Sequence, residues 1–307
     1  MEPSFPTQYS PENTLGSQSD ADIWRALRHG AGGLPSAQSS ESAVMINAQG
    51  VWWAELRRPD GPLVRYGAYV LAGILVALAL YFLLRGRVRI DGGRTGRRLP
   101  RFSLAQRVVH WSIAALFVLL AVSGLLLLFG RALLIPMLGK SAYGVVATAA
   151  MQAHNLFGPI FILSLLAVLV TFIRGNFPAR VDLRWFIRGG GLLGGHASAR
   201  RYNAGEKLWF WTVIIAGFAL SGSGVLLSFP DALATRDLLH LSELTHAIGA
   251  IMLIGFAMGH IYLGSLGTEG TLEGMTEGTV DENWARTHHD LWLTDIDTKN
   301  KAEARWL

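Results

Sequence analysis

The sequence predicts an all-α membrane protein, and two observations support this fold class. Hydrophobic residues make up 51% of the 307-residue chain and charged residues only 16%, with a mean hydropathy of +0.33, a balance that favours a membrane protein over a soluble one. Five apolar runs are also long enough to cross a hydrocarbon core of about 30 Å as helices that rise about 1.5 Å per residue. Because lipid offers the backbone no hydrogen-bond partners, each run is expected to be an α-helix.

The expected spans are Tyr66–Leu84, Val108–Phe129, Thr148–Ile173, Leu208–Ser228 and Leu244–Ser265. The first carries no histidine, and we interpret it as an extra, peripheral anchor. The other four contain a weak internal repeat, since HWSIAALFVLLAVSGLLLLF resembles FWTVIIAGFALSGSGVLLSF and AHNLFGPIFI resembles THAIGAIMLI. This repeat indicates either a duplicated helix pair or only a shared apolar composition. Small residues at Ser123–Gly124 and at positions 221–224 would let a backbone or a flat ligand approach closely.

Basic residues are unevenly placed between the spans. Eight arginines lie between Arg85 and Arg107, and six arginines and a lysine lie between Arg174 and Lys207, whereas the intervening segments hold chiefly Arg131, Lys140 and Arg236. Under the positive-inside rule the arginine-rich segments are cytoplasmic, which puts the N-terminus outside and the C-terminus inside. The net charge of +5 follows from this topology, so no nucleic-acid partner is expected.

Four regions are expected along the chain. Residues 1–62 form an external N-terminal tail, residues 63–100 the extra transmembrane helix and a basic cytoplasmic loop, residues 101–268 a four-helix core, and residues 269–307 a cytoplasmic C-terminal tail. The first region lacks the basic start and apolar centre of a signal peptide, so either a signal has been removed or the tail is exported with the first span. Within it, SDADIWRALRHG predicts a short amphipathic helix that docks on an external partner or lies free on the surface.

The chain contains no cysteine, which excludes a cysteine-bound iron–sulfur cluster or a thiolate-bound metal in this chain. Any metal must therefore be held by histidine, carboxylate or methionine. Nine histidines are present. Four of them lie in expected spans: His110 near the start of the second, His154 near the start of the third, and His246 and His260 near the two ends of the fifth.

These four histidines fall into two pairs. His246 and His260 are 14 positions apart, which turns a helix by about 1400°, about 40° short of four full turns, and advances it by about 21 Å. They therefore face the same way at opposite depths. In the predicted topology His110 lies at the cytoplasmic end with His260, and His154 lies at the external end with His246.

Two histidine pairs about 20 Å apart would suit two haems, each with one imidazole bound to the iron on either side of the flat ring. Filling both axial positions would leave one-electron transfer as the chemistry. Spacing and topology leave three other readings open, namely a Zn²⁺ or Cu²⁺ site, helix–helix hydrogen bonds, and a cofactor-free transporter or proton relay that uses the histidines. The remaining histidines are expected to be solvated surface residues: His29, His196, His240, His288 and His289.

An ordered set of motifs runs through residues 101–292: RFSLAQRVVHW, AHNLFGPIFI, RGNFP, YNAGEKLWFW, SGSGVLLSFP, THAIGAI and GHIYLGSLGTEGTLEGMTEGTVDENWARTHHD. This set resembles the membrane cytochrome b (gamma) subunit of respiratory formate dehydrogenases. The resemblance implies a four-helix transmembrane diheme cytochrome b bundle, here with one extra N-terminal transmembrane helix. It implies two haem b groups, one held by His154 and His246 near the external side and one held by His110 and His260 near the cytoplasmic side.

The resemblance also implies partners and a location. The chain would anchor an Fe–S (beta) subunit and a molybdenum or tungsten catalytic (alpha) subunit in the bacterial inner (plasma) membrane. It would pass electrons through both haems to a quinone, menaquinone or ubiquinone, near the cytoplasmic side, with formate oxidised on a partner. The same core would also suit a hydrogenase or a thiosulfate or polysulfide reductase.

Five further residues are candidates on weaker grounds. The asparagine implicated in the family's quinone site matches Asn203. Alternatively, Asn203 is the N-cap of the fourth span and forms a capping box with Glu206. Arg101 and Arg107 precede His110 and either contact haem propionates or anchor the membrane boundary. Glu206 and Lys207 are candidate proton conduits.

Overall fold

The computed structural model describes residues 53–191, 196–230 and 235–303. Among them, the helices long and apolar enough to cross a membrane are α3 (Pro62–Arg85), α4 (Leu104–Phe172), α6 (Ala204–Ser228) and α8 (Arg236–Tyr262), which continues through the π-helical turn η4 (Leu263–Gly267). The chain is therefore an all-α, multi-pass membrane protein, as predicted. The amphipathic helix expected around Ser19–Gly30 lies outside the described residues.

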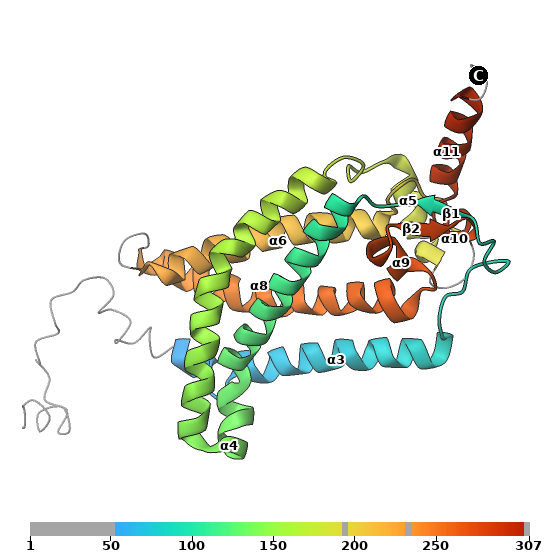
Figure 1. Cartoon of the computed structure of the whole chain (residues 1–307). Helices are drawn as coiled ribbons and strands as arrows, with labels where there is room; N and C mark the ends of the chain where they lie inside the picture. Colours follow the sequence, from blue (N-terminus) through green and yellow to red (C-terminus); the bar gives the residue numbers. More distant parts are fainter. Residues whose placement is uncertain (1–52, 192–195, 231–234, 304–307) are drawn as a thin grey trace, which may run out of the picture.

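Helix α4 doubles back on itself and carries two of the predicted spans (Figure 1). It reverses at Gly139, whose φ of +80° suits a residue without a side chain. The helix has 69 residues, so each arm is about 50 Å long, well beyond the about 30 Å needed to cross the hydrocarbon core. The prediction of a loop between the second and third spans is therefore wrong. Residues 130–138 and 140–147 are helical and extend the hairpin.

The remaining long helices pack side by side, with α8 between α6 and α3 (Figure 1). Glycines permit close approach at two of the contacts. A Cβ atom on Gly255 of α8 would lie 2.5 Å from Ile74 Cδ1 of α3, and one on Gly217 of α6 would lie 2.7 Å from Leu165 Cδ2 of α4. The first predicted span is thus a helix, α3, at the edge of the bundle that packs against α8 on the side opposite α6. This position fits its expected role as a peripheral anchor.

A folded cap closes one end of the bundle, which we call the basic end because the two arginine-rich segments meet there. The cap contains β1 (Arg98–Pro100), α5 (Arg180–Ile187), η3 (Gly189–Gly191), α9 (Thr271–Thr276), β2 (Thr279–Asp281), α10 (Glu282–His288) and α11 (Asp290–Glu303). Strands β1 and β2 pair antiparallel, with Leu99 opposite Val280. Around them a hydrophobic core gathers Ile90, Leu99, Val280, Trp284, Ala285, Trp292 and Leu293. The segment expected to be a C-terminal tail is therefore folded against the loop that precedes α4.

The carboxylate of Asp281 connects the segment before β1 with the start of α10. It accepts hydrogen bonds from the backbone nitrogens of Gly96 at 2.9 Å and Asn283 at 2.8 Å, the latter capping α10. Burial favours the neutral acid, but hydrogen bonds from Thr95, Asn283 and Gly96 outweigh it and lower the pKa of Asp281. The charged carboxylate thus holds the start of α10 to the residues before β1.

Candidate functional site

Two histidine pairs lie between α4 and α8. The ring centroids of His110 and His260 are 6.2 Å apart, and those of His154 and His246 are 5.9 Å apart. Two imidazoles that bind one metal ion from opposite sides, with metal–nitrogen bonds of about 2 Å, place their rings about 6 Å apart. The structure brings together the same histidines that the sequence was expected to pair, because each arm of α4 presents one histidine to one end of α8.

The pair at the basic end is surrounded by tryptophans. The ring of His260 stacks on Trp209 with centroids 4.8 Å apart and planes 17° apart. Trp111 meets the His110 ring edge-on at 5.1 Å and donates from Nε1 to the Met275 carbonyl at 3.0 Å. Within the described residues, His110 Nδ1 is buried and has no hydrogen-bond partner.

The pair at the opposite end, which we call the far end, has polar neighbours instead. Nδ1 of His154 lies 2.8 Å from Ser123 Oγ, and Nδ1 of His246 lies 3.1 Å from Ser223 Oγ. Both serines are buried, with exposed fractions of 4% and 5%. These contacts hold the orientation of both rings.

A cavity of about 480 Å³ opens beside the basic-end pair, within the usual size range of small-molecule sites. His260, Trp209, Asn203 and Glu206 contribute to its lining, together with residues of the cap. Asn203 Oδ1 accepts from the Glu206 backbone nitrogen at 2.9 Å, and Glu206 Oε2 accepts from the Asn203 backbone nitrogen at 2.9 Å. The predicted capping box at the start of α6 is confirmed. It uses the side-chain oxygen of Asn203 and not its amide Nδ2, for which no hydrogen bond is seen within residues 53–191, 196–230 and 235–303.

Lys207 is not part of the lining of this cavity. Its ammonium group is paired with the Asp182 carboxylate of α5 at 2.9 Å, and both side chains are largely buried. Glu206 lines the cavity, whereas Lys207 does not. The two candidate proton conduits therefore occupy different surroundings.

Arg101 is enclosed within the cap. Its side chain is 1% exposed and forms an ion pair with Glu206, at 3.2 Å from Nη2 to Oε1. Aromatic rings surround the guanidinium, the nearest being Trp292 at 4.9 Å and the others Phe102, Tyr202 and Trp284. Arg107, by contrast, donates from Nη1 to the Thr276 carbonyl at 2.6 Å, and its buried Nε has no partner among the described residues.

The expectation of a solvated surface role is wrong for His289. Its side chain is 1% exposed, Nδ1 donates to the Arg200 carbonyl at 2.7 Å, and Nε2 faces Arg101 Nη2 at 3.4 Å. Burial, and then the charge of Arg101, lower the pKa of His289 well below its ordinary value. Burial also lowers the pKa of His288 to about 4. The signal missed in the sequence is the run of apolar and aromatic residues around THHD, which buries this segment.

His196 fits the expected surface setting, because its side chain is exposed and contacts Asp290 at 3.0 Å. His240 fits it less well, because its side chain is only 20% exposed and lies 3.4 Å from the buried Glu243. His29 lies outside the described residues.

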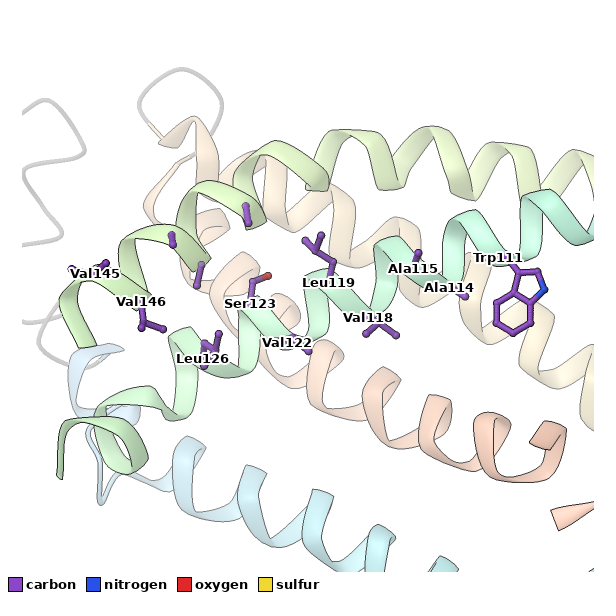
Figure 2. Close-up of a pocket in the computed structure, with 13 residues that line it drawn as sticks. Trp111, Ala114, Ala115, Val118, Leu119, Val122, Ser123, Leu126, Val145 and Val146 are labelled. Carbon is purple, nitrogen blue, oxygen red and sulfur yellow. The ribbon is translucent and has the colours of Figure 1, made fainter. Parts of the chain in front are cut away.

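A second hollow is apolar. Figure 2 shows this groove between the two arms of α4, with Trp111, Val118 and Ser123 on the first arm and Val145 and Val146 on the second. Its other lining residues are alanine, valine and leucine, and none of them ionises. This groove therefore suits contact with hydrocarbon rather than chemistry.

Comparison with known proteins is consistent with this architecture. The family model described as prokaryotic cytochrome b561 matches residues 101–278, more than half of the chain. The cytochrome b556(Fdn) subunit of the nitrate-inducible formate dehydrogenase of Escherichia coli K12 is 29% identical over 216 residues, covering 68% of this chain and 95% of that protein. The cytochrome b556(fdo) subunit of formate dehydrogenase from the same organism is 30% identical over 212 residues, covering 67% of this chain and 97% of that protein. A formate dehydrogenase cytochrome b556 subunit from Haemophilus influenzae is 27% identical over 205 residues, covering 64% and 83%.

The matched region contains all four paired histidines, whereas α3 precedes the family match. Family membership implies haem b as the cofactor. The chain belongs to the prokaryotic cytochrome b561 family and is a membrane cytochrome b of the formate dehydrogenase type.

Proposed function

We propose that this chain is the diheme cytochrome b subunit of a formate dehydrogenase complex. The observation that supports this most directly is the presence of two histidine pairs, one toward each end of the bundle, with ring separations of 6.2 and 5.9 Å. Neutral imidazole is the donor that a bis-histidine haem requires. Within the described residues no group of three or more histidine, cysteine or carboxylate side chains gathers, which favours two-ligand haem sites over a tetrahedral Zn²⁺ site.

Each histidine pair would hold one haem b, with His110 and His260 at the basic end and His154 and His246 at the far end. The bound haems supply one-electron redox chemistry. The protein would supply two imidazole nitrogens to each haem, which would leave no open position for a substrate. Tight packing of α8 against α6 keeps the two sites at a fixed separation along one rigid helix.

The cavity beside His260 would take the quinone, menaquinone or ubiquinone. The free amide of Asn203 is a hydrogen-bond donor suited to a quinone carbonyl, and the Trp209 ring offers a flat apolar wall. Glu206 at the same wall is 34% exposed and would pass protons from the cytoplasm. Arg107 is the better candidate for a haem propionate, because the charge of Arg101 is already paired with Glu206.

The expected orientation puts the basic end in the cytoplasm of a bacterial inner membrane, with the N-terminus in the periplasm. Electrons would enter at the far end from the Fe–S (beta) subunit of a complex whose molybdenum or tungsten (alpha) subunit oxidises formate. The names of the three relatives support formate dehydrogenase as the complex. Each electron that crosses a membrane potential gains or loses about 2.3 kcal/mol per 100 mV, so this arrangement would couple oxidation to charge separation.

Haem quantitation in single histidine variants tests the ligand assignment. The purified wild-type complex is expected to carry two b haems per chain in a dithionite-reduced minus oxidised spectrum. His154→Ala and His246→Ala should lose the same haem, His110→Ala and His260→Ala the other, and a double variant within one pair no more than either single. His196→Ala is the matched control and should keep both. Fewer than two haems in the wild type, or loss that does not follow the pairs, would contradict the proposal.

A formate-to-quinone assay tests the complex and the quinone site. Asn203→Ser keeps an oxygen that can cap α6 but removes the amide, so quinone reduction should fall while both haems remain reducible by dithionite. Full quinone reduction by this variant would exclude the role of Asn203. Co-purification with a hydrogenase or a sulfur-compound reductase, without formate activity, would move the chain to another complex.

A further inference from the structure

The two far-end histidines have matching contacts with neighbouring helices. Ser123 of the first arm of α4 contacts His154 of the second arm, and Ser223 of α6 contacts His246 of α8. In both cases the serine belongs to the helix that precedes its histidine along the chain. The weak internal repeat seen in the sequence thus places equivalent residues in equivalent contacts.

The hydrogen bonds fix which ring nitrogen carries the proton. Ser123 donates its hydroxyl proton to the Leu120 carbonyl at 3.1 Å, and Ser223 donates to the Leu220 carbonyl at 3.0 Å. Each serine oxygen is then left to accept from the histidine. His246 Nδ1 also lies 3.0 Å from the Leu220 carbonyl, which can only accept. Both rings therefore hold the proton on Nδ1 and present the Nε2 lone pair to a metal.

A glycine after each serine makes room for the ring. A Cβ atom on Gly124 would lie 3.4 Å from His154 Cε1, and one on Gly224 would lie 3.1 Å from His246 Cε1. The second distance is tighter than most side-chain contacts allow. Each serine–glycine pair therefore acts as one unit, in which the serine binds the ring nitrogen and the glycine leaves space beside it.

The basic-end pair lacks this arrangement on at least one side. Nδ1 of His110 is buried without a hydrogen-bond partner among the described residues, and His260 stacks on Trp209. A hydrogen-bond acceptor at Nδ1 makes the opposite ring nitrogen a stronger donor to the metal. A stronger donor stabilises ferric iron more than ferrous iron and so lowers the reduction potential.

We propose that Ser123 and Ser223 are positioning residues that hold His154 and His246 as Nδ1-protonated ligands and keep the reduction potential of the far-end haem below that of the basic-end haem. This rests on the proposed function, since it requires a haem at each pair. The two potentials then make electron transfer from the far end to the basic end energetically downhill. The serines achieve this through hydrogen bonding, without contacting the iron.

Spectroscopically monitored potentiometry of the purified complex tests the proposal. Ser123→Ala and Ser223→Ala should each raise the lower of the two haem reduction potentials. A tenfold change in the ratio of ferric to ferrous affinity corresponds to about 59 mV for a one-electron couple. The higher potential should stay unchanged. Ser221→Ala is the matched control, because it removes a hydroxyl from the same helix whose buried Oγ has no partner among the described residues. It should move neither potential.

An unchanged lower potential in both serine variants, an equal shift in the Ser221→Ala control, or a shift confined to the higher potential would overturn the proposal. If Ser223→Ala loses its haem, Ser223→Thr decides, because it restores the hydroxyl. Recovery of the haem at the wild-type potential supports a hydrogen-bonding role, and continued loss indicates packing alone. Failure of the proposed function is seen separately, as fewer than two haems in the wild-type spectrum before any potential is measured.

Discussion

Replacing Arg101 with leucine is expected to loosen the cap at the basic end. The guanidinium of Arg101, just before α4, contacts Glu206 at the start of α6 and lies 3.4 Å from His289 Nε2. Its ion pair with Glu206 measures 3.2 Å, and its centre lies 4.9 Å from the Trp292 ring. Arg101→Leu would remove both interactions while keeping an apolar side chain among the aromatic rings.

The expected cost follows from opposing terms. A hydrogen bond to a charged group is worth about 1.5–3 kcal/mol, reduced here because Glu206 is 34% exposed and shares its charge with water. A desolvated cation over an aromatic ring adds about 2 kcal/mol. Against these, Nε and Nη1 of Arg101 are buried without partners among the described residues, and leucine relieves that penalty. The net destabilisation of the cap is about 2 kcal/mol, or about thirtyfold in the opening equilibrium.

Hydrogen–deuterium exchange of the purified protein measures this opening. Amides of residues 279–293 should exchange about thirtyfold faster in Arg101→Leu, while amides of α8 should keep their protection. Arg98→Leu is the control, because Arg98 is 44% exposed and its ion pairs with Glu273 and Glu277 lie at the surface, where each is worth about 1 kcal/mol or less. Equal exchange in the wild type and Arg101→Leu would refute the reasoning.

Three further outcomes are expected. Acidification should loosen the cap, because burial lowers the pKa of His288 to about 4 in the folded protein, below its value of about 6.5 in the unfolded chain. The contribution of neutral His288 to the stability of the cap is fully present above about pH 6.5 and is lost as the pH falls toward 4. Exchange of α10 measured from pH 7 to pH 4 should show this, and a His288→Asn variant should lose part of the pH dependence. Gly255→Leu should displace α3 from α8 and leave both haem spectra intact. Gly73→Leu is the control and should displace neither helix, because a Cβ atom at Gly73 meets open space. The yield of an engineered disulfide between α3 and α8 in this cysteine-free chain measures the displacement. Asp182→Ala should destabilise the protein by about 3–5 kcal/mol by stranding the buried Lys207 ammonium, and equal thermal unfolding of variant and wild type would contradict this.

The membrane architecture and the pairing of the histidines could be predicted from local sequence. Apolar runs of sufficient length must be helices in lipid, and a 14-residue separation fixes the relative direction and depth of His246 and His260 on one helix. The arginine distribution then assigns His110 and His154 to opposite ends. Each of these steps depends on helix geometry and on interactions with solvent or lipid, which act on short segments of chain.

The extended hairpin of α4 and the burial of His289 depended on contacts between distant segments. Residues 130–147 remain helical past the hydrocarbon boundary except at Gly139, where the chain turns. His289 is buried because α10 packs against residues that lie close to two hundred positions earlier in the chain, and no local pattern specifies which charged group will face it.

The sequence by itself thus determined that four histidines occupy two depths in a helical membrane protein, because helical periodicity and hydropathy act locally. Only the tertiary structure decided that Ser123 and Ser223 meet the far-end rings, that His110 Nδ1 has no such partner in the part of the chain that the structure describes, and that Arg101 is enclosed by the cap. Hydrogen bonds and ion pairs of this kind require distances near 3 Å between side chains on different helices, and such distances are set by the packing of the whole bundle.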